Sequence, residues 1–331
     1  MLPRRNSLYV LLFLASLVLL VEAVWLVPVV LQRWHPYDYG LYVEMGQQQL
    51  QGENPYGMSH YWPLYTIFWV FRPLALLPDW FVLVWVLVPL ASLLSIHRMN
   101  GLILLFYTPL WMVIADGLID GVLLLPAYWL LQDTVAWAGV GAVLLLTKPQ
   151  LAILAVAGRF LDWLKKRSKA TWRQIGAFSI ALVILVLPSF LIWPAWPRAW
   201  LAVLPMRAAE TTTILPRMAG SVWSWWALGL PGKLIALFLI AAALGLFARA
   251  WRSGNGIVAL LLMGLFLTPF LFASNLFIAC AALRARRQIE LVTALSLFAW
   301  LVDRWANPFA GVFAFIPLLV LWFYRRPAKE M

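Results

Sequence analysis

Ionisable side chains that interrupt a very apolar sequence are the residues best suited to chemistry. Asp38, Asp116, Asp120 and Lys148 come from separate parts of the chain, and each borders a stretch of apolar residues. Charged groups at membrane depth are costly, and those that are kept usually serve a function. A carboxylate in a partly dry pocket suits general-base chemistry, because loss of hydration raises its pKa.

Asp38 lies in the sequence HPYDYGLY, between aromatic residues, and two interpretations of it stay open. As a helix N-cap, it would accept a hydrogen bond from a backbone amide of a helix that begins near Tyr39. As a general base, it would take a proton from a sugar hydroxyl.

Lys148 also has two interpretations. In one, its ammonium group reaches the membrane surface while its aliphatic stem stays in the apolar region. In the other, this compact cation binds a phosphate oxygen. Pro149 follows directly, and proline ends the preceding helix, so we expect a break between two helices here.

Asp116 and Asp120 stand four residues apart in the sequence DGLIDG, which is one turn if the segment is helical. We expect each of them either to cap a helix or to hold a sugar hydroxyl. Arg207 and Arg217 lie in a later loop, where they either pair with Glu210 or bind a phosphate headgroup.

The composition predicts a helical membrane protein. Of 331 residues, 64% are hydrophobic and 11% charged, and the mean hydropathy is +0.87. Apolar runs of roughly 20 residues recur, and each can span a hydrocarbon core about 30 Å thick as a helix. The net charge of +12 is interpreted as membrane topology rather than nucleic-acid binding. The single cysteine, Cys280, excludes an intrachain disulfide, and no metal site is predicted.

Lysine and arginine gather at residues 165–169, 284–287 and 325–329, and we place these clusters in the cytoplasm. The N-terminal apolar stretch is interpreted as an uncleaved first helix, and the stretch 61–77 as a re-entrant or interfacial segment. About twelve helical spans, with both termini cytoplasmic, satisfy these constraints. They are residues 8–32, 79–97, 101–115, 118–131, 134–147, 150–164, 174–193, 232–250, 255–270, 271–284, 288–303 and 307–324.

Two long segments, 33–78 and 194–231, then fall on the non-cytoplasmic face of a single integral membrane domain, 1–331. We expect interfacial helices in the first segment and an active-site face formed by both. Tryptophans flank the second segment, where they form either an aromatic belt at the headgroup level or a wall for a lipid-linked substrate. His60, in the first segment, is typical of a surface residue, with substrate contact as the alternative.

The first half of the chain resembles a known family. The run Asp38-x-x-x-Tyr42, Gly52-x-Asn54-Pro55-Tyr56 and Tyr61-x-Pro63, followed by PLALLP at 73–78 and TKPQLAIL at 147–154, is similar to the polyprenyl-phosphate-mannose-dependent α-mannosyltransferases, a family of GT-C glycosyltransferases. The chain departs from the family's pattern at Gly117-Leu118-Ile119-Asp120 and at Ser274-Asn275.

The resemblance implies an all-α bundle of GT-C type, an active site on the non-cytoplasmic face of the cell membrane, and Asp38 as the catalytic base. Nucleotide sugars are cytosolic, so an enzyme on that face needs a sugar, such as mannose or another hexose or pentose, already carried by a polyprenyl phosphate. This donor is a co-substrate, and no further cofactor is expected. The acceptor is a lipid or a glycan, and the configuration inverts. The residues expected to bind the donor phosphate are Lys148, Arg207 and Arg217, and those expected to bind substrate are Tyr42, Asn54, Tyr56, His60, Tyr61, Asp116, Asp120 and Gln150.

Two other functions remain open. A transporter or flippase of lipid-linked material would carry polar residues through the middle of the bundle, often at broken helices in paired halves. A membrane scaffold with a decayed site would share the fold without the activity.

Overall fold

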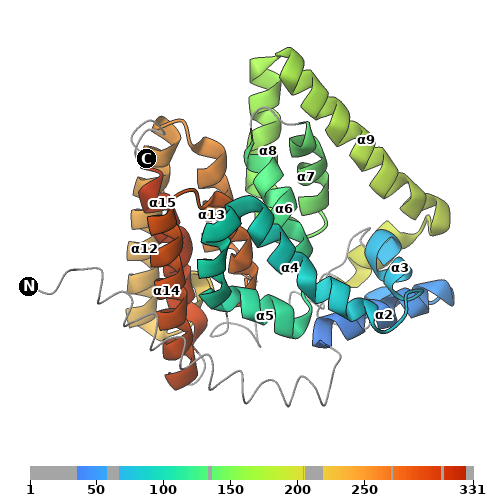
Figure 1. The fold of residues 1–331 in the computed structure, drawn as a ribbon, viewed down its shortest axis with the longest axis horizontal. Helices are drawn as coiled ribbons and strands as arrows, with labels where there is room; N and C mark the ends of the chain where they lie inside the picture. The colour runs from blue at the N-terminus through green and yellow to red at the C-terminus, as the bar shows by residue number, and fades with distance from the viewer. Residues whose placement is uncertain are drawn as a thin grey trace, which may run out of the picture.

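The computed structural model describes residues 36–57, 67–132, 136–203, 205, 219–269, 271–306 and 309–325, and its elements there are all helical (Figure 1). The first elements are α2 (Tyr37–Leu50), η1 (Pro55–Gly57), η2 (Ile67–Phe71), α3 (Arg72–Leu74), α4 (Phe81–His97), η3 (Arg98–Phe106), α5 (Thr108–Asp116), α6 (Asp120–Leu131) and α7 (Trp137–Leu145). The later ones are α8 (Pro149–Lys166), α9 (Lys169–Ile192), α11 (Trp223–Trp226), α12 (Gly229–Arg252), α13 (Gly256–Leu267), η4 (Ala273–Ala282), α14 (Arg286–Trp305), η5 (Ala310–Ala314) and α15 (Phe315–Phe323).

Within the described residues, three helical stretches are long and apolar enough to cross a membrane, as expected for a membrane protein. They are Phe81–Phe106, Lys169–Ile192 and Gly229–Arg252. The prediction of about twelve full crossings is not confirmed, because several predicted spans are short or divided. Helices α5 and α7 have 9 residues each, and a helix of that length covers only about 14 Å.

Proline accounts for part of this division. Pro109 lies in the first turn of α5, and the predicted span 101–115 is split there between the 3₁₀ helix η3 and α5. Pro149 begins α8, so the predicted break after Lys148 is confirmed. The predicted span 271–284 contains a ten-residue 3₁₀ helix, η4.

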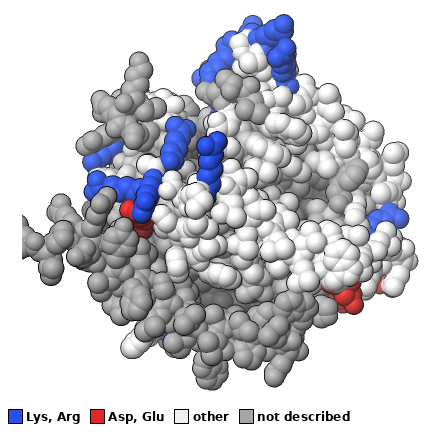
Figure 2. Space-filling view, viewed as in Figure 1, with Lys and Arg blue, Asp and Glu red and all other residues white. Residues whose placement is uncertain are grey.

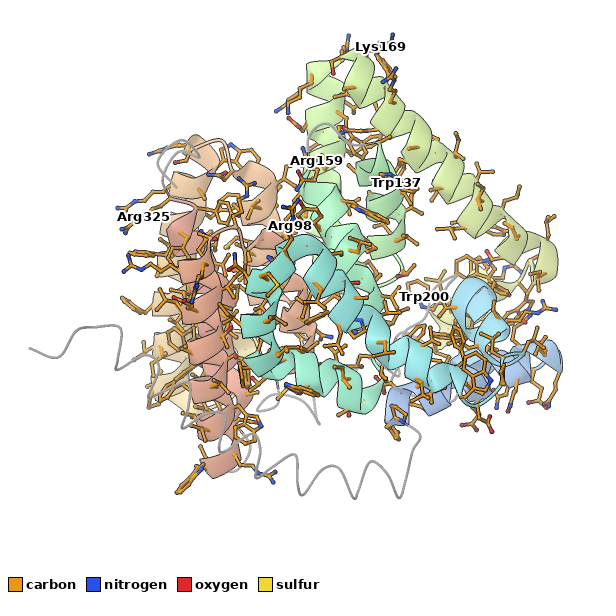
Figure 3. The ribbon with its side chains drawn as sticks, in the orientation of Figure 1. Arg98, Trp137, Arg159, Lys169, Trp200 and Arg325 are labelled. Carbon is orange, nitrogen blue, oxygen red and sulfur yellow. The ribbon has the colours of Figure 1, made fainter. Side chains whose placement is uncertain are left out.

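Two predicted turns are present at basic residues. Helix α4 ends at His97, and Arg98, with φ of 52°, redirects the chain into η3, which packs against α4. Helices α8 and α9 meet in a hairpin with Lys169 near its tip, and α9 then slants away from α8 toward α2 and α3 (Figures 1 and 3).

The helices enclose two apolar cores. The larger core joins α5–α8 to α12–α15 and the fully buried 3₁₀ helix η4. The smaller core joins α2, η2 and α3 to the start of α4 and the end of α9. At its centre Tyr42 stacks on Phe71, with ring centroids 4.4 Å apart. The part of the stretch 61–77 that the structure describes therefore packs on α2 as η2 and α3.

Two tryptophans of the second predicted loop have a structural role. The indole of Trp223 donates to the carbonyl of Leu267 at 2.6 Å, and that of Trp225 donates to Gly311 at 2.9 Å. Both carbonyls lie at a helix end or in a 3₁₀ turn, where they need a donor from outside the helix. These two side chains therefore fasten α11 to the end of α13 and to η5, in addition to any interfacial role.

Charge is unevenly distributed over the surface. In the view of Figure 2, lysine and arginine gather at the tip of the α8–α9 hairpin and beside the C-terminal helices. Acidic side chains are visible near α2 and the start of α4, and one lies within the basic group beside the C-terminal helices.

Candidate functional site

Asp38 lies in the first turn of α2 and does not cap it. The N-cap residue is Pro36, and the cap position makes no side-chain hydrogen bond. Proline lacks an amide hydrogen, which costs nothing at a helix N-terminus, and the helix begins at Tyr37, two residues earlier than the predicted Tyr39. The N-cap interpretation of Asp38 is therefore wrong, and its carboxyl group is left for another role.

Asp116 and Asp120 lie on two different helices. Asp116 ends α5 and Asp120 begins α6, because Gly117 between them adopts a left-handed conformation with φ of 67°. The indole of Trp85 in α4 fixes this turn by donating to the Gly117 carbonyl at 2.8 Å. The segment is therefore not one continuous helix, and the one-turn spacing that a helical segment would give does not apply.

The Gly117 turn lies directly against α2. A Cβ atom on Gly117 would lie 2.7 Å from Cβ of Pro36 and 2.8 Å from Cβ of Tyr39, so only glycine permits this approach. A second contact links α2 to the start of α6, because the Ile119 amide donates a hydrogen bond to the Tyr42 hydroxyl oxygen at 3.3 Å. Tyr42 is fully buried, so it positions α6 instead of lining a space open to substrate, contrary to our expectation.

Lys148 is held in the linker between α7 and α8, where it forms a buried ion pair. Its ammonium nitrogen lies 2.6 Å from Oδ2 of Asp120, and the exposed fractions of the two side chains are 11% and 0%. The interpretation of Lys148 as a residue that extends to the membrane surface is therefore wrong. Asp120 makes no cap hydrogen bond, and its burial also argues against direct contact with a sugar.

Asn275 completes this group, and sequence reasoning did not assign it a role. Its side-chain amide donates to Oδ1 of Asp120 at 3.1 Å, and its carbonyl oxygen accepts from the Phe272 amide at 2.8 Å. The pair thus joins α6 and α8 to the start of η4. The sequence did contain a signal: Asn275 directly precedes the apolar run 276–283, and an amide side chain that is buried there needs a hydrogen-bond partner.

Asp38 shares an electrostatic environment with the other three ionisable groups. Burial raises its pKa to about 7; the positive charge of Lys148 opposes this shift, and Asp116 and then Asp120 add to it. Partial loss of hydration also raises the pKa of Asp116, although the residue is exposed at the surface of the protein. The structure therefore brings together the four residues that the sequence singled out.

The structure also describes three other residues that were expected to bind substrate. The Asn54 side chain accepts from the Tyr56 amide at 3.1 Å and so begins η1, while Tyr56 is buried and stacks on Trp193 at the end of α9. Gln150 follows Lys148 by two residues, and its backbone carbonyl accepts from the Thr268 hydroxyl at 2.7 Å. Asn54 and Tyr56 thus shape the loop near α9. His60, Tyr61, Arg207 and Arg217 lie outside the described residues, so their roles remain predictions.

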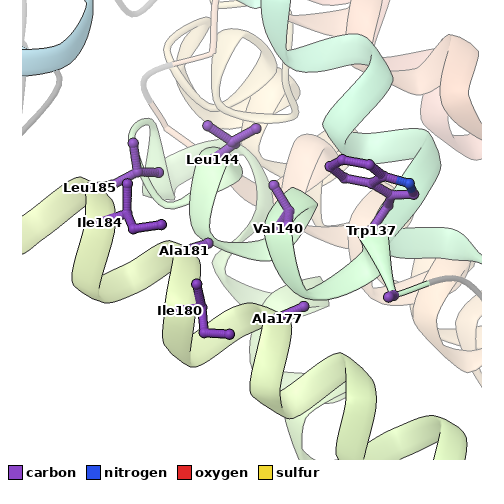
Figure 4. Close-up of a pocket in the computed structure, with 9 residues that line it drawn as sticks. Trp137, Val140, Leu144, Ala177, Ile180, Ala181, Ile184 and Leu185 are labelled. Carbon is purple, nitrogen blue, oxygen red and sulfur yellow. The ribbon is translucent and has the colours of Figure 1, made fainter.

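An apolar pocket opens between α7 and α9 (Figure 4). The two helices touch at Gly139, where a Cβ atom would lie 2.1 Å from the Gln174 carbonyl oxygen. Farther along, the two helices border an open pocket of about 470 Å³ that is lined by alanine, valine, leucine, isoleucine and one tryptophan. Leu144, which lines this pocket, precedes Lys148 by four residues. Leu185 lines the pocket and also packs against the smaller core.

Comparison with known proteins adds no identification: no protein-family model, no curated protein and no solved structure matches this chain. Within the described residues, no group of three or more histidine, cysteine, aspartate or glutamate side chains is arranged to hold a metal ion.

Proposed function

We propose that the protein is an integral-membrane glycosyltransferase that transfers a sugar from a polyprenyl phosphate to a hydroxyl group of a lipid or glycan. The main support is Asp38, a partly buried carboxyl group whose pKa of about 7 lies close to neutral pH. A general base works best when its pKa is near the working pH. Burial is the main cause of this pKa; the charge of Lys148 lowers it, and those of Asp116 and Asp120 raise it further.

In the proposed reaction, the acceptor hydroxyl oxygen attacks the anomeric carbon while Asp38 takes the hydroxyl proton. A new carbon–oxygen bond forms, the bond from the anomeric carbon to the phosphate oxygen breaks, and polyprenyl phosphate leaves with the electron pair. This single displacement inverts the anomeric configuration. Asp38 then returns its proton to water.

Lys148 would stabilise the leaving phosphate, although the ion pair with Asp120 changes how it does so. A lysine ammonium has three N–H donors, and the bond to Asp120 uses one of them. Asp120 and Asn275 would hold the ammonium in a fixed position, so that little reorganisation is needed as charge develops on the phosphate. Arg207 and Arg217 are further proposed partners of this phosphate.

The pocket between α7 and α9 fits the carrier's hydrocarbon chain. Its lining is apolar, and α7 runs from the pocket toward Lys148, where the phosphate would lie. A chain in this pocket would bury its surface against both helices, at a gain of about 25 cal/mol per Å² relative to water.

The test uses the full chain in proteoliposomes with a radiolabelled polyprenyl-phosphate mannose and membranes that supply acceptors. We expect release of polyprenyl phosphate together with labelled product, and Asp38→Asn should lower the rate about 10²–10⁴-fold. Glu44→Gln, an exposed change on the same helix, should retain the rate. An unchanged rate in Asp38→Asn would remove Asp38 from the mechanism, whereas an inactive parent chain with mannose and with other hexose and pentose donors would remove the proposed reaction.

A transporter of lipid-linked material is the second candidate, and the broken helices favour it. Asp116 and Asp120 border one break and Lys148 another, and transporters often bind ions or substrates at such discontinuities. Movement of a labelled polyprenyl-linked sugar across the vesicle membrane, without any transfer product, would support transport and contradict the glycosyltransferase.

A further inference from the structure

Three chain segments far apart in the sequence are fastened together beside the C-terminal end of α15. The Ser253 hydroxyl, between α12 and α13, donates to the Arg325 carbonyl at 2.9 Å, and the Asn255 side chain donates to the Tyr324 carbonyl at 3.2 Å. The Tyr324 hydroxyl donates in turn to the carbonyl of Ala282 at the end of η4. These bonds hold together the segments that carry Arg252, Arg284, Arg286 and Arg325. We call this group of four arginine side chains the arginine junction.

The arginine junction consists of Arg252, Arg284, Arg286 and Arg325. The Arg284 guanidinium lies 5.4 Å from the centre of the Tyr324 ring, and that of Arg325 lies 4.1 Å from the centre of the Trp322 ring. A guanidinium stacked on a ring keeps a planar edge of N–H donors that matches the oxygens of a phosphate. Aromatic contacts thus hold two of the four arginines in place.

Positive charge at the junction exceeds the negative charge beside it. Arg286 pairs with Glu290 at 2.8 Å, one turn along α14. Among the described residues, no ion pair forms at Arg252, Arg284 or Arg325. The junction therefore presents an excess of cationic groups, visible in Figure 2 beside the C-terminal helices, and Figure 3 places Arg325 at their outer edge.

The position of the junction along α12 matches the headgroup level of a membrane. Helix α12 has 24 residues and is long and apolar enough to cross a bilayer, and Arg249 and Arg252 stand in its last turn. Trp251 in the same turn and Trp322 near the end of α15 are 50% and 42% exposed. Exposed tryptophan beside arginine at the end of a membrane-length helix is typical of the interface between hydrocarbon and headgroups.

We propose that the arginine junction binds the phosphate headgroup of an anionic phospholipid. The guanidinium groups supply bidentate donors to the phosphate, and the exposed tryptophans contact the glycerol and upper acyl region, which free phosphate lacks. This inference is independent of the chemistry at Asp38.

The test reconstitutes the full chain in nanodiscs of phosphatidylcholine with a small fraction of phosphatidylglycerol. After mild detergent extraction, native mass spectrometry counts the lipids that stay bound. We expect the protein to retain phosphatidylglycerol in preference to phosphatidylcholine. The double variant Arg284→Gln with Arg325→Gln should lower this retention about thirtyfold. Arg252→Gln supplies a second variant if the first loses its native elution profile.

The control variant is Lys165→Gln with Lys169→Gln, which removes the same charge from exposed positions at the α8–α9 hairpin. It should retain phosphatidylglycerol like the parent chain. Equal loss in control and junction variants would indicate diffuse attraction and overturn the proposal, as would equal retention of the two lipids by the parent chain. Displacement of the lipid by millimolar inorganic phosphate would assign the site to free phosphate and overturn the lipid assignment.

Discussion

Asp38 illustrates how one residue acquires its properties from neighbours distant in the sequence. An isolated aspartate has a pKa of 3.8, and in this protein burial raises the pKa to about 7. The deprotonated form acts as the proposed base, so the transfer rate should rise as pH increases through about 7. Because Asp116 and Lys148 act on this pKa in opposite directions, each also tunes the pH dependence.

Asp116→Asn should shift the rising limb of the pH–rate profile to lower pH. The substitution removes a negative charge that raises the pKa of Asp38, so Asp38 loses its proton at a lower pH than in the parent chain. Initial transfer rates measured between pH 5 and 9 on the same proteoliposomes test this, with the pH values set by the reaction buffer.

Asp79→Asn is the matched control for this measurement. Asp79 is an exposed aspartate in the loop before α4 and has no part in the pKa shift of Asp38, so the profile should stay in place. A limb that does not move in Asp116→Asn, or that moves to higher pH, would contradict the proposed coupling.

The Lys148–Asp120–Asn275 group shows that a buried charged residue is stable only together with its hydrogen-bond and ion-pair partners. Both carboxylate oxygens of Asp120 have a partner, and the carboxylate is inaccessible to water. Loss of one member of a buried ion pair typically costs about 3–5 kcal/mol, because the other charge is left uncompensated. The three residues therefore function as one unit that joins α6, α8 and η4.

At the scale of elements, the contact between α2 and the α5–α6 turn determines whether the site forms. Gly117→Ala should separate them, because a Cβ would overlap Pro36 and Tyr39 and alanine disfavours φ of 67°. We expect a loss of about 1–3 kcal/mol in stability and a fall of about 100-fold in transfer rate, since small displacements of catalytic groups have large effects. Thermal unfolding and transfer assays measure the two effects.

Gly245→Ala serves as the control for that substitution. Gly245 lies inside α12 with open space around it, and alanine is favoured over glycine in a helix. It should therefore leave the transfer rate unchanged and raise the thermal midpoint slightly. If Gly117→Ala behaved in the same way, close packing at the turn would not be needed for the site.

The pocket between α7 and α9 leads to a second prediction at this scale. Ala181→Trp should fill the pocket and raise KM for a long-chain polyprenyl donor about tenfold, because the buried chain surface is lost. A donor with a short prenyl chain does not reach the pocket, so its KM should stay close to that of the parent protein.

Val183→Trp adds the same bulk on the outer side of α9, where the side chain is 56% exposed and does not line the pocket. It should leave both KM values unchanged. Equal increases for long and short donors in Ala181→Trp would show that the substitution disturbs the site itself, and the tail-binding role would be rejected.

In the molecule as a whole, basic and acidic side chains gather at different ends of the helices. The α8–α9 hairpin and the arginine junction carry basic residues, whereas Asp38, Asp116 and Asp120 lie together near the start of α2 and α6. Lysine and arginine favour the cytoplasmic side of a membrane. The proposed orientation therefore places the hairpin tip in the cytoplasm and the aspartate group outside.

Single cysteine substitutions test this orientation. Lys169→Cys, at the hairpin tip, and Asp79→Cys, in the loop before α4, should react with a membrane-impermeant maleimide from opposite sides of sealed vesicles. The native Cys280 is fully buried and should not react, so it provides the internal background. Labelling of both positions from the same side would contradict the predicted topology.

Features that depend on neighbouring residues were predictable from the amino-acid sequence. Composition indicated a helical membrane protein, and the helix ends at His97 and before Pro149 followed from local charge and from the missing amide of proline. Hydropathy also located most helices, since α4, α8, α9, α12 and α14 lie close to predicted spans. Such signals act within a few residues and are readable without the fold.

Which polar residues meet, and how long each helix is, depends on packing between segments that are distant in the sequence. Lys148 pairs with a residue 28 positions away, and Asp120 binds an amide 155 positions away, so neither partner was visible locally. Hydropathy records the apolar character of a segment but not its 3₁₀ turns, which is why the predicted spans 101–115 and 271–284 are divided or contain a 3₁₀ helix in the structure. The pKa of Asp38 depends on burial and on three distant charges, because desolvation and Coulomb forces act through space and not along the chain.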